Sequence, residues 1–156
     1  MTITTNPAKP TPAETRASPA STATTATDPV LEALFESFMQ MTHDGLAHAT
    51  ALTAEARENL DDNVDITNQI FRLVHDIKGQ GLTFGYPLLS RIGASLCDFI
   101  RYVTKPVSDE QLGVVSLHLE ALSFVIKNDI KGEPGDSYQR LVSQLDHLVQ
   151  KTETPS

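Results

Sequence analysis

The chain has little of what several large classes of protein require. Among its 156 residues there is one cysteine, Cys97. A single cysteine allows no intrachain disulfide, and no set of cysteines and histidines has the spacing of a structural zinc site. No run of about 18 apolar residues is present, so we expect no membrane span, and the N-terminus lacks the apolar core of about 7–15 residues that a secretory signal needs. These absences favour a cytoplasmic protein.

The chain is acidic, with a formal net charge of -8. Proteins bind nucleic acids through contacts of Lys and Arg with phosphates, so this charge argues against a nucleic-acid partner. No stretch resembles a nucleotide-binding loop or the ATP-binding domain of a kinase. We therefore expect neither a nucleic-acid-binding protein nor an enzyme with its own ATP site.

Composition divides the chain into three segments. Residues 1–27 are rich in Thr, Ala, Pro and Ser and contain almost no large apolar side chain. Such a segment cannot bury enough surface to offset the entropy of ordering it, so it is predicted to be a disordered tail, either without specific function or acting as a tether or a vestigial linker. Residues 28–151 are predicted to form one helical domain, and residues 152–156 a flexible C-terminus.

Apolar residues recur at helical spacing throughout the predicted domain, and no strand pattern appears. Asp28 and Pro29 are typical of a helix start, and Gly45 is predicted to break this first helical stretch into two. The further expected helices are one that begins at 61–63 and ends near Gly79, Gly81 and Gly85, one with an apolar stripe from Leu88 to Val103, one that opens with a capping box of Ser108 and Gln111, and one capped by Asp136 with Gln139 as partner. Four long amphipathic helices with short connections predict an all-α, antiparallel four-helix bundle, which an additional N-terminal helical segment covers.

The helix that contains His75 carries the most informative group of side chains. Its apolar stripe is formed by Ile66, Ile70, Leu73 and Ile77, at steps of four, three and four. At roughly 100° per residue, His75 lies about 180° from the centre of that stripe. A histidine that served the core would lie among the apolar residues, so His75 is expected to face outward.

The expected neighbours of His75 leave an open face around it. Lys78 is one turn further along the helix, and Gly79, four residues on, has no side chain to crowd the imidazole. Gly81 lies nearer the apolar stripe and is expected to permit the close approach of another helix. The other residues expected on or beside the outer face are Asn68, Phe71, Arg72 and Leu82.

The order of these residues resembles a known signature. His75, Lys78 and Gly79 match the His-x-x-Lys-Gly pattern of histidine phosphotransfer (HPt) domains. The resemblance implies a helical-bundle phosphocarrier that moves a phosphoryl group between the aspartates of receiver domains, with an N-terminal helical segment over the end of the bundle. It continues into the next helix through Leu82, Gly85, Leu88, Leu89 and Ile92.

Elementary chemistry agrees with the roles that the resemblance implies. A neutral imidazole has a free lone pair, and an isolated histidine side chain has a pKa of about 6.5, so it can attack phosphorus without a general base. His75 is the expected phosphoryl acceptor and donor, with Lys78 offsetting the phosphoryl charge and Gly79 giving access. Gln80 lies about 140° from His75 and is a weak candidate for contact with the phosphate. The resemblance implies that Mg²⁺ comes from the receiver partner, so we expect no cofactor on this chain.

The remaining histidines and the cysteine have simpler interpretations. His43 and His48 are five residues apart, a poor spacing for two ligands on one helix face, so both are expected at the surface. His118 and His147 are isolated from any group of Cys, Asp or Glu. Cys97 is expected to be an ordinary thiol and not a nucleophile.

Other functions stay open at this point. The chain could be a helical adaptor that binds a receiver or another helical partner through Phe71 and Leu82 without transfer, or the N-terminal helix could cover these two residues. It could be the phosphoryl-accepting domain of a chemotaxis-type kinase, although no kinase domain accompanies it. A hydrolytic or metal enzyme is disfavoured because no second titratable group pairs with His75. The favoured prediction is a monomeric HPt protein of a multistep phosphorelay, with receiver domains as partners.

Overall fold

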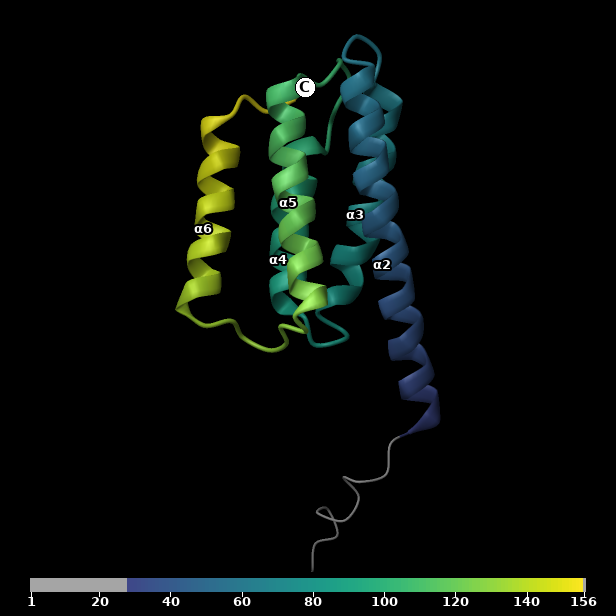
Figure 1. Ribbon diagram of the computed structural model, residues 1–156. Helices are drawn as coiled ribbons and strands as arrows, with labels where there is room; N and C mark the ends of the chain where they lie inside the picture. Colours follow the sequence, from purple (N-terminus) through teal and green to yellow (C-terminus); the bar gives the residue numbers. More distant parts are fainter. Residues whose placement is uncertain (1–27, 156) are drawn as a thin grey trace, which may run out of the picture. The chain divides into compact units, whose positions relative to one another are not determined.

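The computed structural model describes residues 28–155 of the chain. These residues form five helices and no strand: α2 (Pro29–Glu58), α3 (Val64–Gly81), α4 (Pro87–Ile100), α5 (Asp109–Lys127) and α6 (Asp136–Lys151) (Figure 1). The predicted all-α bundle is confirmed. The predicted tail, residues 1–27, lies outside the described part of the chain. In the predicted C-terminal segment, the Glu153 carbonyl oxygen accepts a hydrogen bond from Gln111 Nε2 at 2.8 Å.

The chain forms two compact units, according to which residues lie close together. The first unit ends at Ala33, and the second, which begins at Leu34, contains the helix bundle. Before this division, the Asp28 carboxylate accepts a hydrogen bond from the Val30 N–H at 2.8 Å. A carboxylate that accepts a backbone N–H two residues further on is typical of a helix cap, so the predicted helix start at Asp28 and Pro29 is confirmed.

α2 is one helix of 30 residues, so the predicted break at Gly45 is wrong. Gly45 is buried, and a Cβ atom at this position would lie 3.2 Å from Ile77 Cδ1 on α3. The glycine therefore lets α2 approach the helix that carries His75. A glycine inside a helix costs about 1 kcal/mol relative to alanine, and here the close packing offsets that cost. α2 contributes to the core through Phe38, Thr42, Gly45, Leu46, Ala49, Leu52, Thr53 and Ala56, all of which are buried.

α3 and α4 pack side by side and antiparallel (Figure 1). Residue numbers rise along one helix while those of the contacting residues fall along the other. The contacts that show this direction join Gly81 to Ser90, Lys78 to Gly93, and Phe71 to Arg101. The part of α3 on either side of His75, from Phe71 to Gly81, is therefore bordered by α4 and its C-cap residue.

α4 is the central helix of the bundle, since nine of its 14 residues are buried. It ends at Ile100, earlier than the stripe to Val103 predicted. Val103 is nevertheless only 4% exposed, because the loop after α4 turns back against the core. A buried loop residue continued the apolar pattern of the helix, which made the helix look longer in the sequence.

Asn63 fixes the start of α3 through contacts that are distant in the sequence. It occupies the N-cap position of α3, but its side chain makes no cap hydrogen bond. Instead, its buried side-chain amide donates to the carbonyl oxygens of Val107, at 2.9 Å, and of Ala56, at 3.2 Å. Its side-chain oxygen accepts from the Val107 N–H at 2.7 Å. The loops before α3 and α5 are thus joined, and the buried amide is fully paired.

Of the two predicted caps in the second half of the chain, one is confirmed. The Gln111 N–H donates to Ser108 Oγ at 3.2 Å, and the Ser108 N–H donates to Gln111 Oε1 at 2.9 Å, which completes the capping box. The predicted cap at Asp136 is wrong, because Gly135 is the N-cap residue of α6 and Asp136 is its first helical residue. Gln139 makes only a long contact, at 3.5 Å, with a carbonyl oxygen of the preceding loop.

α6 contributes a single buried residue, Leu145, to the bundle. A polar chain links it to the centre: Ser95 Oγ on α4 donates to Asp146 Oδ1 on α6 at 2.9 Å and lies 3.1 Å from His118 Nε2 on α5. His118 was predicted to be isolated from carboxylates, and this link through Ser95 corrects that prediction. His118 Nδ1 lies 2.8 Å from the Val114 carbonyl oxygen, and burial lowers the pKa of the imidazole. His118 is therefore a neutral structural residue at neutral pH.

Aromatic rings and Asp129 hold the loop between α3 and α4. Phe84 stacks on Phe38 of α2, with 4.5 Å between ring centroids. Tyr86 is buried, and its hydroxyl donates to Asp129 Oδ1 at 2.5 Å. Burial raises the pKa of the Tyr86 hydroxyl, so it stays protonated and keeps donating. Gly85 has φ +88°, a conformation that favours glycine, so the chain can turn sharply into α4.

Thr42 is the residue on which we expect a stabilising substitution. Among the described residues, its Oγ1 is buried and has no hydrogen-bond partner. Thr42→Val keeps the shape of the side chain and removes the unpaired hydroxyl, so the free energy of unfolding should rise by about 1 kcal/mol, as measured by urea denaturation. Thr53 on the same helix is the matched control, because its buried hydroxyl donates to the Ala49 carbonyl oxygen at 2.8 Å. Thr53→Val should not stabilise the fold, and equal responses of the two variants would contradict the explanation.

Candidate functional site

His75 lies on α3 with its side chain 52% exposed, so the predicted outward position is confirmed. Its exact place on the helix differs from the expectation. Ile70, Val74 and Ile77 are completely buried, whereas Leu73, expected in the apolar stripe, is only partly buried. The core face of α3 is therefore centred nearer Val74, and His75 lies roughly 120° from its centre instead of 180°. The imidazole thus occupies the flank of the helix.

The imidazole ring of His75 is free of hydrogen bonds within the described part of the chain. Asp76 Oδ1 lies 4.0 Å from His75 Nδ1, which is beyond hydrogen-bond distance. The Phe71 ring lies one turn away, with 5.7 Å between the ring centroids and an interplanar angle of 35°. An imidazole in this state has a ring nitrogen whose lone pair is available to an incoming group.

Lys78 is held beside His75 by a glycine on the neighbouring helix. A Cβ atom added to Gly93 of α4 would lie 2.9 Å from Lys78 Cβ, so the absence of a side chain at Gly93 makes room for the lysine stem. The sequence offered one signal for this role, a glycine in the middle of an amphipathic helix, and the prediction missed it. Lys78 is half-buried and makes no ion pair with the residues from 28 to 155. Its ammonium group is available to offset another negative charge.

The two glycines near the end of α3 differ in their surroundings. A Cβ atom on Gly79 would meet no atom of residues 28–155 within 4 Å, so this position is open on the face of His75. A Cβ atom on Gly81 would collide with Ser90 Oγ and lie 3.1 Å from the Tyr86 carbonyl oxygen. The predicted close helix approach at Gly81 is confirmed, whereas Gly79 is free of any packing constraint.

The apolar residues that flank His75 are not equally accessible. Leu82 is 68% exposed, whereas Phe71 is half-buried beneath Arg101, the C-cap residue of α4, whose Cζ atom lies 5.7 Å from the Phe71 ring centroid. Phe71 is therefore partly covered by the C-terminal end of α4, a contact that the sequence did not predict. Arg72 is exposed and Asn68 half-buried, both on the side of His75. Gln80 is exposed too, but it points away from the imidazole by its helical angle.

Comparison with known protein families decides the identity of the fold. Residues 33–124 match the family model of the Hpt domain, which is more than half of the chain. This chain belongs to the Hpt domain family. Searches of curated proteins and of solved structures found no match. The matched part includes the whole of α3 with His75, and α6 lies beyond it.

Membership confirms the resemblance indicated by the His-x-x-Lys-Gly pattern. Hpt domains are phosphocarriers of histidine phosphotransfer and not kinases, and in phosphorelays they interact with receiver domains. The chain is thus a phosphorelay protein of two-component signal transduction. None of the helices between residues 28 and 155 has the length and apolar character needed to cross a lipid bilayer.

The other candidate side chains of this Hpt domain form no competing site. Burial raises the pKa of the Cys97 thiol to about 11, so little reactive thiolate exists at neutral pH. His43, His48 and His147 are exposed, as expected for the first two, and residues 28–155 contain no group of three His, Cys, Asp or Glu side chains placed to hold a metal ion. His75 with Lys78 is therefore the best-supported site.

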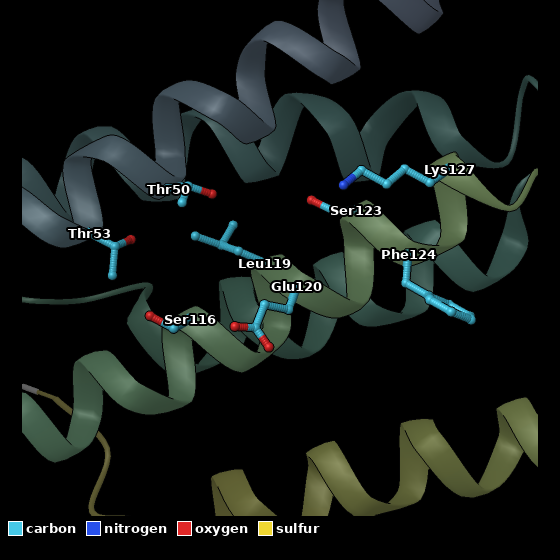
Figure 2. A pocket seen from close by; sticks show the side chains of 8 residues that line it. All are labelled: Thr50, Thr53, Ser116, Leu119, Glu120, Ser123, Phe124 and Lys127. Atoms are coloured by element: carbon cyan, nitrogen blue, oxygen red, sulfur yellow. The ribbon is translucent and has the colours of Figure 1, made fainter.

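A groove between α2 and α5 lies apart from His75 (Figure 2). Its volume is about 480 Å³, and Figure 2 shows Thr50 and Thr53 of α2 across from the α5 residues. Its lining residues are Thr50, Thr53, Ser116, Leu119, Glu120, Ser123, Phe124 and Lys127, and none of them surrounds His75. The candidate site of this Hpt domain is thus an open helix face, which suits chemistry whose other reacting groups belong to a second protein.

Proposed function

We propose that this Hpt domain relays a phosphoryl group between the aspartates of receiver domains in a multistep phosphorelay, through a phosphohistidine at His75. The observation that carries the proposal is that the imidazole of His75 is exposed and makes no hydrogen bond within residues 28–155. His75 is half exposed, has no hydrogen-bond partner among the described residues, and stands at the histidine of the His-x-x-Lys-Gly pattern in an Hpt domain. The other exposed histidines, His43, His48 and His147, have no lysine and glycine at these offsets.

The transfer step follows from the free lone pair of the ring. A nitrogen of His75 attacks the phosphorus of an aspartyl phosphate on the partner. The P–N bond forms, the P–O bond to the aspartyl oxygen breaks, and the carboxylate leaves with the bonding electrons. The reverse step returns the phosphoryl group to another receiver aspartate. Because phosphoryl transfer depends mainly on positioning and charge stabilisation, the chain needs no general base for this step.

Lys78 and Gly79 have distinct parts in the proposed step. Lys78 lies one turn from His75 and makes no ion pair among the described residues, so its ammonium group can offset the charge of the phosphoryl group. Gly79 leaves the surface above the imidazole open. Mg²⁺ is supplied by the acidic pocket of the receiver, and the chain itself holds no cofactor in this proposal.

The proposed docking face surrounds His75 on α3. Leu82, 68% exposed, is its apolar contact, and Phe71 contributes the exposed part of its ring. Arg72 and Asn68 form a polar rim, and Gln80 lies outside the immediate phosphate contacts. We further propose that the protein acts as a monomer in the cytoplasm, because a single outward histidine on a self-contained bundle requires no second copy.

The decisive experiment is a phosphotransfer assay with a panel of receiver domains, each charged with labelled phosphoryl by a hybrid kinase. We expect acid-labile, base-stable label on the wild-type chain, the stability typical of a phosphohistidine, and its release to a second, unlabelled receiver. Binding of a receiver without uptake of label would support a helical adaptor instead. Neither label nor binding across the panel would contradict both functions.

Gly79→Glu should separate docking from stability. A glutamate at this position would stand one turn from His75 and add bulk and negative charge where the phosphoryl group arrives. We expect the rate of label uptake to fall by at least about tenfold, which corresponds to a loss of about 1.4 kcal/mol. The free energy of unfolding should stay the same or rise by up to about 1 kcal/mol, because glutamate forms helices better than glycine. Label uptake at the wild-type rate would show that Gly79 does not provide access.

A further inference from the structure

Arg101 lies next to the proposed site on α3, although it is the C-cap residue of α4. Its Cζ atom is 5.7 Å from the centroid of the Phe71 ring, and the Phe71 centroid is 5.7 Å from that of the His75 imidazole. A protein interface buries about 800 Å² on each partner, which corresponds to a patch with a radius of about 16 Å. Even if these two distances of 5.7 Å pointed in the same direction, Arg101 Cζ would lie inside a patch of this radius centred on His75. A partner that reaches His75 therefore also reaches Arg101.

The guanidinium of Arg101 is held in place before any partner arrives. Its Nη2 atom donates to Asp98 Oδ1 at 2.9 Å, and its Cζ atom lies over the Phe71 ring, 5.7 Å from the ring centroid. A cation–π contact and an ion pair together restrict a side chain that otherwise loses much rotamer entropy on binding. Arginine is one of the residue types enriched among those that dominate the energy of an interface.

Arg101 also keeps donors free for a partner. A guanidinium has five N–H donors in a planar fork, and the bond to Asp98 uses one of them. The side chain is 34% exposed, so part of this fork reaches the surface. A planar fork of N–H groups matches the two oxygens of a carboxylate.

The charge of the chain explains why such a contact is needed. The net charge of -8 repels an acidic partner. A pocket that holds Mg²⁺ beside a phosphorylated aspartate is built from carboxylates, so the receiver presents negative charge where it meets His75. Cations near His75 must therefore overcome the repulsion locally, and the described residues Arg72, Lys78 and Arg101 can supply this positive charge.

We propose that Arg101 is a docking and specificity-determining residue of this Hpt domain, whose guanidinium, held by Asp98 and Phe71, binds a carboxylate at the rim of the receiver's phosphorylation pocket. This proposal rests on the function proposed above. It assigns recognition of the partner to the C-terminal end of α4, whereas the transfer chemistry stays on α3.

The test compares two phosphoryl donors. The first is the labelled phospho-receiver domain that charges the wild-type chain fastest, used over a range of concentrations and at two salt concentrations. The second is labelled phosphoramidate, a small donor whose P–N bond breaks as imidazole takes the phosphoryl group and ammonia leaves. Phosphoramidate has no protein surface to dock. The variants are Arg101→Ala, Arg101→Lys, Asp98→Asn and, as a matched control, Arg91→Ala. Arg91 lies on α4, the helix that Arg101 caps, and pairs with Glu133 at 3.2 Å.

We expect Arg101→Ala to raise the KM for the phospho-receiver by about tenfold, as for an interface residue worth about 1.4 kcal/mol, with little change in the maximal rate. Arg101→Lys should restore part of the loss, and Asp98→Asn should raise KM by about threefold, because the cation remains but is no longer held. Added salt should reduce the difference in KM between wild type and Arg101→Ala, because salt screens the attraction between exposed charges. Arg91→Ala should have the wild-type KM for the phospho-receiver. Every variant should be labelled at His75 by phosphoramidate at the wild-type rate.

Three results would overturn the assignment: an unchanged KM for Arg101→Ala, an equal effect of Arg91→Ala, or a parallel loss of phosphoramidate labelling, which would mean that Arg101 acts on the imidazole through Phe71. Failure of the function itself has a different signature. In that case the wild-type chain takes up no label at His75 from either donor, and the proposal for Arg101 is overturned with it.

Discussion

Replacing His75 with glutamine is expected to abolish the uptake of phosphoryl label and to leave the fold unchanged. Glutamine has no lone-pair nitrogen that can form the phosphoramidate bond, so transfer should fall to the background of the assay. The side chain is 52% exposed and makes no hydrogen bond within the described residues, so the free energy of unfolding should change by less than about 0.5 kcal/mol. Labelling by a phospho-receiver and urea denaturation measure the two quantities on the same protein.

His43→Gln is the matched control for this experiment. His43 is an exposed histidine on α2 without a lysine three residues further on, so its replacement should leave label uptake and stability as in wild type. Residual acid-labile label on His75→Gln would place the phosphoryl group on another histidine. Loss of the helical fold in His75→Gln would instead mean that this imidazole supports the core.

Gly81→Ala is expected to destabilise the protein by about 1–3 kcal/mol, the usual range for an added methyl group in a packed interior. The new Cβ would collide with Ser90 Oγ and lie 3.1 Å from the Tyr86 carbonyl oxygen and 3.2 Å from the Ser90 backbone nitrogen. Ser90 Oγ cannot move freely, because it donates to the Lys78 carbonyl oxygen at 2.8 Å. Either α3 and α4 separate or this hydrogen bond breaks, and both outcomes cost stability.

Gly79→Ala, two residues earlier on the same helix, provides the control for Gly81→Ala. Its Cβ would meet no atom of the described part of the chain within 4 Å, so the gain in helix propensity should raise the free energy of unfolding by up to about 1 kcal/mol. Urea denaturation should thus give changes of opposite sign for the two variants. Adding Ser90→Ala to Gly81→Ala should recover only part of the loss, because the backbone contacts remain. Equal stabilities of the two glycine variants would refute the close approach of α3 and α4 at Gly81.

Periodicity and one short motif were sufficient to predict the helical class, the outward position of His75 and the family. These features depend on local spacing along a single helix, which the sequence shows directly. The capping box of Ser108 and Gln111 was predictable for the same reason, since its two residues are three positions apart. The predicted limits of the domain, at residues 28 and 151, stay a prediction.

Features that depend on a partner from elsewhere in the chain were missed. The sequence alone predicts a helix break at Gly45, because the residue that packs against it, Ile77, is on another helix. The sequence places Asn63 at the start of α3, but the partner of its side-chain amide, Val107, lies 44 residues further on. His118 meets its carboxylate only through Ser95, and Arg101 reaches the site only because α3 and α4 are antiparallel. Spacing along one helix contains no information about which residue of another helix arrives opposite it.

The unbonded imidazole of His75 has an energetic consequence for a relay. A site that surrounded a phosphoryl group with many donors would lower its free energy and hold it, and the onward step would then become unfavourable. His75 offers the group one neighbouring lysine and otherwise exposes it to water. In the proposed function, the phosphoimidazole bond therefore keeps most of its intrinsic transfer potential. A carrier of this proposed kind works near equilibrium, so the relative amounts of charged and uncharged receivers set the direction of flow.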